Sequence, residues 1–170
     1  MTKKGDTAVK AVYEELKEDI RDYIKSHSVC TLAVSEGNNP SANTVYYISD
    51  AGFRIYFESN PDSDKIRILK NNPRVSLTID ENYGDWRKVK GIQMFGRARM
   101  VDSREDTQLK EKFLKKFPQT KKLGGIPKHH VFVEITPEKI YYLDFSKDIG
   151  HRSVYFPETS KQGFLSRINW

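Results

Sequence analysis

Apolar residues near the start of the chain recur at the spacing of one helix face. Val12, Leu16 and Ile20 are separated mainly by acids and lysines. This spacing predicts an amphipathic helix over residues 8–26. Most of the remaining sequence consists of short runs in which apolar and polar residues alternate, with Gly, Asn, Asp and Pro between the runs. Such alternation is typical of strands that bury one face, so the pattern predicts a mainly β protein with flanking helices.

Seven segments have the composition and alternation of strands. They span residues 29–35, 43–49, 53–58, 74–80, 91–101, 130–136 and 139–145. Turn residues between the first three predict a hairpin that continues as a three-stranded meander. Pro137-Glu138 predicts a final hairpin between the last two segments. Gly96, inside the longest one, predicts a bulge or a close backbone approach.

Two further helices are predicted between the strands. A short helix begins after Ser63, which is placed to cap it, and ends before Pro73. A second amphipathic helix follows the longest strand. Seven short strands with few helices favour a β-barrel over a doubly wound sheet. We expect a single domain over residues 1–170, with the barrel at about 28–146 and a tail at 147–170.

The composition limits where the protein works. The 170 residues include one cysteine, Cys30, which lies in an apolar run, so no internal disulfide can form and a reduced compartment is expected. No window approaches the roughly 18 consecutive apolar residues that a membrane-spanning helix needs. We therefore expect a cytoplasmic protein that does not associate with membranes.

A formal net charge of +6 raises the question of a nucleic-acid partner, because clustered Lys and Arg attract phosphate backbones. The basic residues of this chain are scattered, and the densest group, residues 110–116, contains an acid and falls on a predicted helix. We interpret this group as a solvated helix face and expect no nucleic-acid partner. A small anionic ligand such as a phosphorylated cofactor also suits a mildly basic protein.

A longer motif lies in the middle of the chain. A strand that ends in Tyr56-Phe57-Glu58-Ser59 runs into Ser63-Asp64-Lys65, and the short helix ends in Asn72-Pro73-Arg74-Val75-Ser76-Leu77. With the order of the predicted elements, this motif resembles the pyridoxamine 5′-phosphate oxidase-like flavoproteins over roughly residues 12–152. The resemblance implies an FMN-binding split barrel that works as a homodimer and builds each flavin site from two subunits.

The motif contains a candidate phosphate site. Ser59 and Ser63 offer hydroxyl donors, Lys65 offers a positive charge, and the start of the short helix adds backbone N–H groups. We predict that these three side chains hold the phosphate of FMN. The alternative is a polar loop with a capping serine. Relatives usually carry an arginine where this chain has Asp64, so the site has one positive charge fewer.

The resemblance implies further contacts to cofactor and substrate. In relatives the backbone of the second strand follows the edge of the isoalloxazine ring, and the matching residues here are Asn43, Thr44 and Val45. Relatives also often place a polar side chain of the neighbouring subunit near the flavin, which corresponds to Gln93. Taken alone, Val45 is expected in the core and Gln93 in solvent. Arg152 matches the arginine of an Arg-x-His pair, and we predict that it contacts the substrate.

Three positions depart from the true oxidases. Phe113 and Phe117 stand where those enzymes place a Tyr and an Arg that hold the substrate phosphate. Val154 stands where the histidine of the Arg-x-His pair is expected. Both phenylalanines have the spacing of core residues on a helix. We therefore expect that pyridoxamine 5′-phosphate is not the substrate.

The function expected from these features is that of an FMN-dependent oxidoreductase. Its substrate is an unknown small molecule, with NAD(P)H as a candidate electron donor, and no catalytic residue is assigned because cofactor chemistry requires few protein acids or bases. Two alternatives stay open, a flavin-binding module without turnover and a haem-binding or haem-degrading protein. No metal site is expected, because His129 and His130 are adjacent in a predicted strand and would point to opposite faces.

Overall fold

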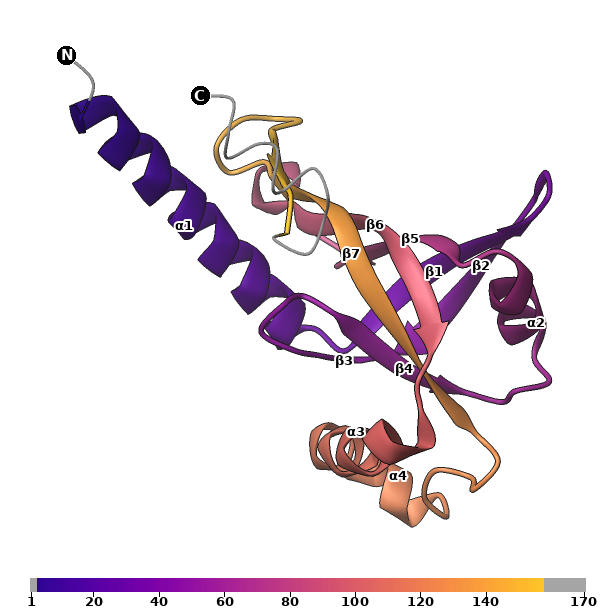
Figure 1. Cartoon of the computed structure of the whole chain (residues 1–170). Coiled ribbons are helices and arrows are strands. Elements are labelled where there is room, and N and C mark those ends of the chain that lie inside the picture. The colour runs from indigo at the N-terminus through magenta and orange to yellow at the C-terminus, as the bar shows by residue number, and fades with distance from the viewer. Residues whose placement is uncertain (1–2, 158–170) are drawn as a thin grey trace.

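The computed structural model of the protein describes residues 3–157 and contains an eight-stranded antiparallel sheet surrounded by helices (Figure 1). The helices are α1 (Lys3–Ser26), α2 (Asp64–Asn71), α3 (Ser103–Lys116) and α4 (Gln119–Lys122), with a 3₁₀ turn, η1 (Trp86–Lys88). The strands are β1 (Val29–Glu36), β2 (Asn39–Tyr46), β3 (Ile48–Ser49), β4 (Ile55–Ser59), β5 (Arg74–Asp80), β6 (Lys90–Met100), β7 (Val131–Asp144) and β8 (Arg152–Tyr155).

The strands are ordered β2-β1-β5-β6-β7-β4-β3, and β8 pairs with β7. The sheet curls into a half-barrel, which confirms the predicted mainly β fold with flanking helices. Helix α1 contacts β3, β6 and β8, whereas α2 contacts β1 and β6, and α3 contacts β3 and β7. The helices therefore lie on different sides of the half-barrel, with α3 and α4 next to each other at one end (Figure 1).

Alternation along the strands divides their side chains between an inner and an outer sheet face. In β1 and β5 every second residue is buried. The inner side chains join Ile20 and Ile24 of α1 in one large apolar cluster, and a second, smaller cluster lies between β4, β7 and α3. Cys30 of β1 belongs to the large cluster, and burial raises the pKa of its thiol to about 12.

The second predicted strand, residues 43–49, is divided into two. Strand β2 pairs with β1 along its whole length, whereas β3 pairs with β4, so the partner changes at Tyr47. Tyr47 is fully buried, and its hydroxyl donates a hydrogen bond to the backbone oxygen of Ile24 at 2.8 Å. The hairpin of the first two predicted strands is confirmed. The continuous three-stranded meander is wrong, because the second strand is shared between two neighbours.

The predicted turn at Pro137-Glu138 is also wrong, because both residues lie inside the single long strand β7. Gly96 of β6 pairs with Pro137, whereas the preceding residue, Phe95, pairs with Lys139. Glu138 is therefore an extra residue in a β-bulge. A bulge tolerates proline because one ladder hydrogen bond is missing there in any case. A Cβ on Gly96 would lie 2.3 Å from the backbone oxygen of Thr136, which confirms the predicted close approach.

The ends of the described chain differ from the sequence-based expectation. Helix α1 begins at Lys3 rather than at residue 8, and the tail contributes β8, a strand too short for its alternation to be recognised. The part of the predicted tail after residue 157 lies outside the described residues. Among the helices of residues 3–157, none has the length and apolar character that crossing a membrane requires.

Candidate functional site

A cleft of about 400 Å³ lies where β2, β4 and α2 face the end of α3 and α4. It is lined by Thr44, Val45, Tyr46, Glu58, Lys65, Phe113, Phe117, Gln119, Thr120 and Leu123. Its volume falls within the range of small-molecule and cofactor sites. Three predicted cofactor-binding residues, Thr44, Val45 and Lys65, therefore meet at one cleft although they belong to different elements.

Ser59, Ser63 and Lys65 converge where β4 ends and α2 begins. The Ser59 and Ser63 hydroxyl oxygens are 3.1 Å apart, and the Lys65 ammonium donates to Ser59 Oγ at 3.4 Å. Ser59 is the last residue of β4 and is 7% exposed, and Ser63 is the N-cap residue of α2. Two hydroxyls and one positive charge thus lie at the positive end of a helix dipole. This set of donors fits a phosphate group.

Ser63 and the adjacent Asp64 also contact residues outside this group. Ser63 takes the predicted N-cap position, but its hydroxyl donates to the backbone oxygen of Asn60 at 2.8 Å and does not cap α2. The Asp64 side chain is 89% exposed, and its carboxylate lies 3.6 Å from Nε of Arg67. The negative charge of Asp64 is therefore held at the surface.

Strand β2 forms one side of the cleft. Thr44 is exposed and Val45 is buried in the main core, and both line the cleft. Asn43 pairs with Leu32 in the ladder, and its amide donates to Ser41 Oγ at 3.2 Å. Thus two of the three predicted strand residues reach the cleft, and Asn43 is not one of its lining residues.

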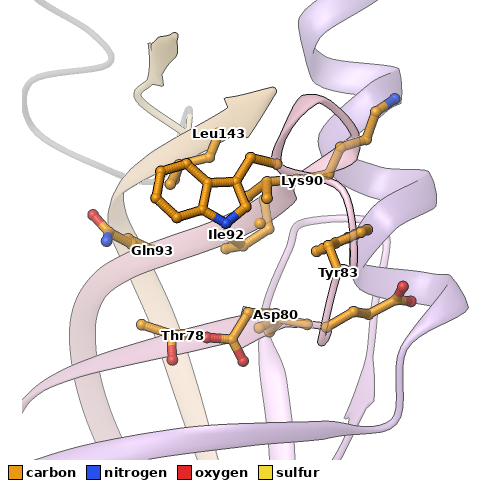
Figure 2. Close-up of a pocket in the computed structure, with 12 residues that line it drawn as sticks. Thr78, Asp80, Tyr83, Lys90, Ile92, Gln93 and Leu143 are labelled. Carbon is orange, nitrogen blue, oxygen red and sulfur yellow. The ribbon is translucent and has the colours of Figure 1, made fainter. Parts of the chain in front are cut away.

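Gln93 lies in a second cleft, of about 330 Å³, between β5, β6 and the loop before β6 (Figure 2). Thr78 and Trp86 line this second cleft, and Trp86 is 74% exposed. Strands β2 and β6 are three positions apart in the sheet, which corresponds to roughly 14 Å. Gln93 therefore does not meet Thr44 or Lys65 within one protomer.

Arg152, the predicted substrate residue, is exposed on β8 and lies near Gln93 rather than near the first cleft. Its guanidinium is 5.0 Å from the centroid of the Tyr141 ring. Tyr141 pairs with Gln93 on one side and with Val154 on the other. The structure thus brings Gln93 and Arg152 together on the outer sheet face and separates both from the candidate phosphate site.

Sequence reasoning missed a hydrogen-bonded pair, Glu58 and His130, at the edge of the first cleft. His130 Nδ1 contacts the carboxylate of Glu58, which lines the cleft. The two residues are 72 positions apart, so no local pattern could have joined them. The predicted opposite orientation of His129 and His130 is wrong, because β7 begins only at Val131 and the two rings lie 4.9 Å apart.

Phe113 and Phe117, at the end of α3, have two roles. They are 4% and 5% exposed and belong to the smaller apolar cluster, which confirms that they are core residues. Their rings, 4.6 Å apart, also border the cleft. Neither ring can donate a hydrogen bond to a phosphate.

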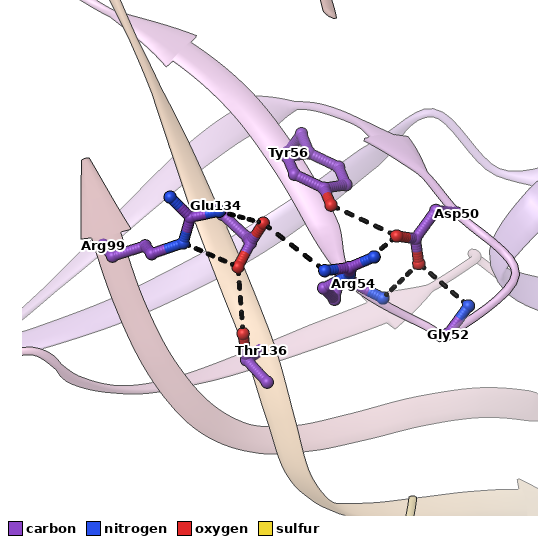
Figure 3. A network of polar contacts seen from close by, with 7 residues as sticks. All are labelled: Asp50, Gly52, Arg54, Tyr56, Arg99, Glu134 and Thr136. Atoms are coloured by element: carbon purple, nitrogen blue, oxygen red, sulfur yellow. Dashed lines mark hydrogen bonds and ion pairs between the residues drawn. The ribbon is translucent and has the colours of Figure 1, made fainter. Parts of the chain in front are cut away.

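A buried carboxylate, Glu134 of β7, is the centre of a polar network outside this cleft (Figure 3). Arg99 Nε and Nη2 each donate to it at 2.9 Å, and the Thr136 hydroxyl donates at 3.2 Å. Arg54 lies 3.9 Å from Glu134 and donates to Asp50 at 2.7 Å. Burial acts to raise the pKa of Glu134, but the bonds and charge of Arg99 outweigh it and lower the pKa. The network joins β6, β7 and the turn before β4, which is a structural role.

Proteins of known sequence or structure resemble this chain. UPF0306 protein PM1958 of Pasteurella multocida is 32% identical over 88 residues, which cover 51% of this chain and 59% of that protein. The matched part of the chain thus spans less than two thirds of that relative. A solved protein of Clostridium acetobutylicum, described as related to general stress protein 26 and to the pyridoxinephosphate oxidase family, has a TM-score of 0.63 at 16% identity, covering 84% of this chain and 95% of that one.

Two further solved structures have the same fold with different described ligands. A FAD-binding protein of Mesorhizobium loti has a TM-score of 0.61 at 24% identity, and the match covers 81% of this chain and 92% of that protein. A heme-binding protein of Mycobacterium smegmatis has a TM-score of 0.64 at 15% identity, and the match covers 79% of this chain and 56% of that protein. At these identities the likeness establishes the fold alone.

The family is established by a sequence profile rather than by these structures. The profile described as pyridoxamine 5′-phosphate oxidase matches residues 16–144, from within α1 to the end of β7, which is well over half of the chain. The matched region contains the cleft and the residues Ser59, Ser63 and Lys65 that converge beside it. By this match, the chain belongs to the pyridoxamine 5′-phosphate oxidase family.

Proposed function

We propose that the protein is a cytoplasmic FMN-dependent oxidoreductase in which Ser59, Ser63 and Lys65 hold the phosphate of FMN. The observation that carries the proposal is that Ser63 and Lys65 both reach Ser59, at 3.1 and 3.4 Å, at the start of α2. Membership of the pyridoxamine 5′-phosphate oxidase family supports a flavin at this position. The exposed, Arg67-paired Asp64 is compatible with it, because that charge does not compete for Lys65.

The cleft supports the chemistry of a bound flavin. Flavin supplies hydride transfer when bound, and the protein's part is to bind, orient and shield the ring. Thr44 and Val45 offer the β2 backbone along one side, and Phe113 and Phe117 exclude water from the other. A small-molecule substrate, with NAD(P)H as the electron donor, then needs no nucleophile or catalytic triad from the chain.

We propose that a second copy of the chain completes each site. Gln93 lies on the outer sheet face, in a cross-strand row with Thr78 of β5, Thr31 of β1 and Thr44 of β2. This row of short, uncharged side chains leads from the second cleft to the first. Two copies that pack through this face around a two-fold axis bring Gln93 of the partner subunit towards the cleft. Arg152 of the partner subunit approaches the substrate in the same way.

The haem-binding alternative has weaker support. Haem iron in proteins is usually held by His, Cys or Met, and less often by Tyr. Among the described residues that line the cleft there is no histidine, cysteine or methionine, and Tyr46 is the candidate ligand within it. His130 lies at the edge of the cleft, but its Nδ1 is engaged by Glu58. A visible spectrum of the purified protein separates flavin bands from a Soret band. Bleaching of the flavin bands by NADPH separates an oxidoreductase from a flavin-binding module without turnover.

The proposal predicts that Lys65→Ala weakens FMN binding by roughly ten- to a hundredfold, because a charge-assisted hydrogen bond to phosphate contributes about 1.5–3 kcal/mol. Riboflavin lacks the phosphate, so its affinity should be the same for both proteins. Fluorescence quenching on titration of each flavin measures both affinities.

Lys70→Ala is the matched control for this experiment. Lys70 is an exposed lysine in the last turn of the same helix, and its loss should change neither flavin affinity. An equal loss of affinity for FMN and riboflavin in Lys65→Ala would contradict the proposal, because Lys65 would then support the fold rather than the phosphate.

A further inference from the structure

The first cleft is chemically divided. The charged residues among those that line it are Glu58 and Lys65, and both belong to the end formed by β4 and α2. The apolar lining residues contributed by the end of β2, by α3 and by the chain that follows α3 are Tyr46, Phe113, Phe117 and Leu123, and we call them the aromatic end. A ligand that extends from Lys65 through the cleft therefore passes from a charged environment into an apolar one.

The aromatic end has a fixed geometry. The Phe117 ring lies 4.6 Å from Phe113, and the Tyr46 ring meets it edge-on at 5.6 Å and 78°. Leu123 belongs to a closed turn, because its N–H donates to the backbone oxygen of Thr120 at 3.1 Å. The apolar side chains are thus positioned before any ligand arrives.

Part of this end is left to solvent. Leu123 is 83% exposed and Tyr46 is 57% exposed, although both border the same cleft as two buried phenylalanines. A single exposed apolar residue is common on protein surfaces, but a group of them around a cleft indicates a binding surface. A ligand that covers Leu123 and Tyr46 is favoured in proportion to the apolar area that it removes from water.

The lysines near the aromatic end are bonded elsewhere or lie outside the cleft lining. The ammonium of Lys116 lies 5.8 Å from the centroid of the Phe117 ring and 4.7 Å from that of Tyr47, and it donates to the backbone oxygen of His27. Burial lowers its pKa. Lys121 and Lys122 of α4 are exposed and are not among the residues that line the cleft. Among the described residues that form the aromatic end, none carries a positive charge, and the ammonium nearest to Phe117 is already bonded to a backbone oxygen.

We propose that the aromatic end binds an uncharged aromatic group of the substrate, beside a flavin whose phosphate is held at Lys65. This inference rests on the proposed function and specifies its substrate class. A flat apolar ring can pack on Phe117 edge to face, as Tyr46 does, whereas an anionic group loses hydration without compensation. Phosphorylated substrates such as pyridoxamine 5′-phosphate are disfavoured for the same reason.

The test compares two ligands of similar shape that differ in charge at neutral pH, 2-naphthol and 2-naphthoate. Each is equilibrated by dialysis against the FMN-loaded protein, and its bound fraction is determined by absorbance after extraction. We expect 2-naphthol to bind roughly tenfold or more tightly than 2-naphthoate, and FMN to stay bound.

Leu123→Lys should reverse this preference, because it adds a positive charge at the aromatic end. Leu123 is 83% exposed, so the substitution should not disturb folding. Ile149→Lys is the matched control, since Ile149 is also an exposed apolar residue, at 57%, and does not line the cleft. A second variant, Tyr46→Ser, should weaken 2-naphthol binding and leave 2-naphthoate unchanged.

Two results would overturn the inference. One is equal binding of both naphthalenes with no response to Leu123→Lys. The other is release of FMN by 2-naphthol, since the aromatic end would then be the site of the flavin ring itself. Retention of FMN, read from visible absorbance, tests the proposed function separately, and the ratio of the two affinities can be measured in the flavin-free protein as well. Failure of one claim is therefore distinguishable from failure of the other.

Discussion

At the scale of single residues, Glu134 makes the stability of the fold depend on pH. Its side chain is 5% exposed and its pKa is lowered despite burial, because Arg99 stabilises the charged form. A carboxyl whose pKa is lower in the folded state contributes stability above its unfolded pKa, near 4.3. That contribution is lost as the pH falls through the lower, folded value.

Glu134→Gln should therefore reduce the free energy of unfolding at pH 7, by about 1–3 kcal/mol, and should flatten its decline in acid. Urea unfolding between pH 3 and pH 7 measures both effects. The control is Glu138→Gln, because Glu138 is 54% exposed and its pair with Arg97 should contribute less than about 1 kcal/mol. Equal pH profiles for wild type and Glu134→Gln would show that the network does not stabilise the charged carboxylate.

The candidate site could be predicted only where its residues are close in sequence. Ser59, Ser63 and Lys65 fall within one turn and the start of one helix, so a local motif was enough to propose them. Glu58 and His130 are brought together by the pairing of β4 with the start of β7, which no local pattern encodes. The phenylalanines were correctly predicted as core residues, but their second role at the cleft depends on where α3 packs.

At the scale of elements, the contact of β6 with β7 depends on one glycine. An added Cβ at Gly96 would overlap the backbone oxygen of Thr136, 2.3 Å away, and strand backbone cannot move aside as a flexible side chain can. We expect Gly96→Ala to destabilise the fold by about 3 kcal/mol, measured by thermal or urea unfolding.

Gly84→Ala serves as the comparison, because no heavy atom lies within 4 Å of the corresponding Cβ. It should leave stability unchanged within about 0.5 kcal/mol. If both alanine variants unfolded at the wild-type midpoint, the close approach at the bulge would be wrong.

Elements with a regular pattern of their own were predictable, and shared or interrupted ones were not. Strand β5 was expected at 74–80 and is found as Arg74–Asp80, because its alternation is complete and Pro73 limits it. The sequence pattern predicts two strands separated at Pro137, because a proline usually ends a strand. In the structure the bulge opposite Gly96 accommodates this proline within the single strand β7. The division of β2 from β3 has no local signal, because it reflects which neighbour each half meets.

At the scale of the whole molecule, we predict a homodimer with a mass of about 40 kDa by light scattering, against 19.8 kDa for one chain. Thr78→Arg places a large charge in the middle of the outer sheet face. This variant should give a monomer and should also lose FMN, because the partner's residues no longer complete the site.

Asn71→Arg controls for the added charge, since Asn71 is exposed on α2 and away from the outer face row. It should remain dimeric and keep its flavin. A monomeric wild-type protein that retains FMN would rule out the shared site, and the roles proposed for Gln93 and Arg152 with it.

The rate at which Cys30 is alkylated can report how often the folded structure opens around it. With a thiol pKa of about 12, on the order of one molecule in ten thousand carries a thiolate at pH 8, and β1 is flanked on both sides by β2 and β5. An alkylating reagent can therefore act only when the apolar cluster around Cys30 opens. The labelling rate counts such events, and a cofactor that joins Thr44 of β2 to Lys65 of α2 should make them rarer. The alkylation rate of Cys30 thus measures cofactor binding without visible absorbance or catalytic turnover.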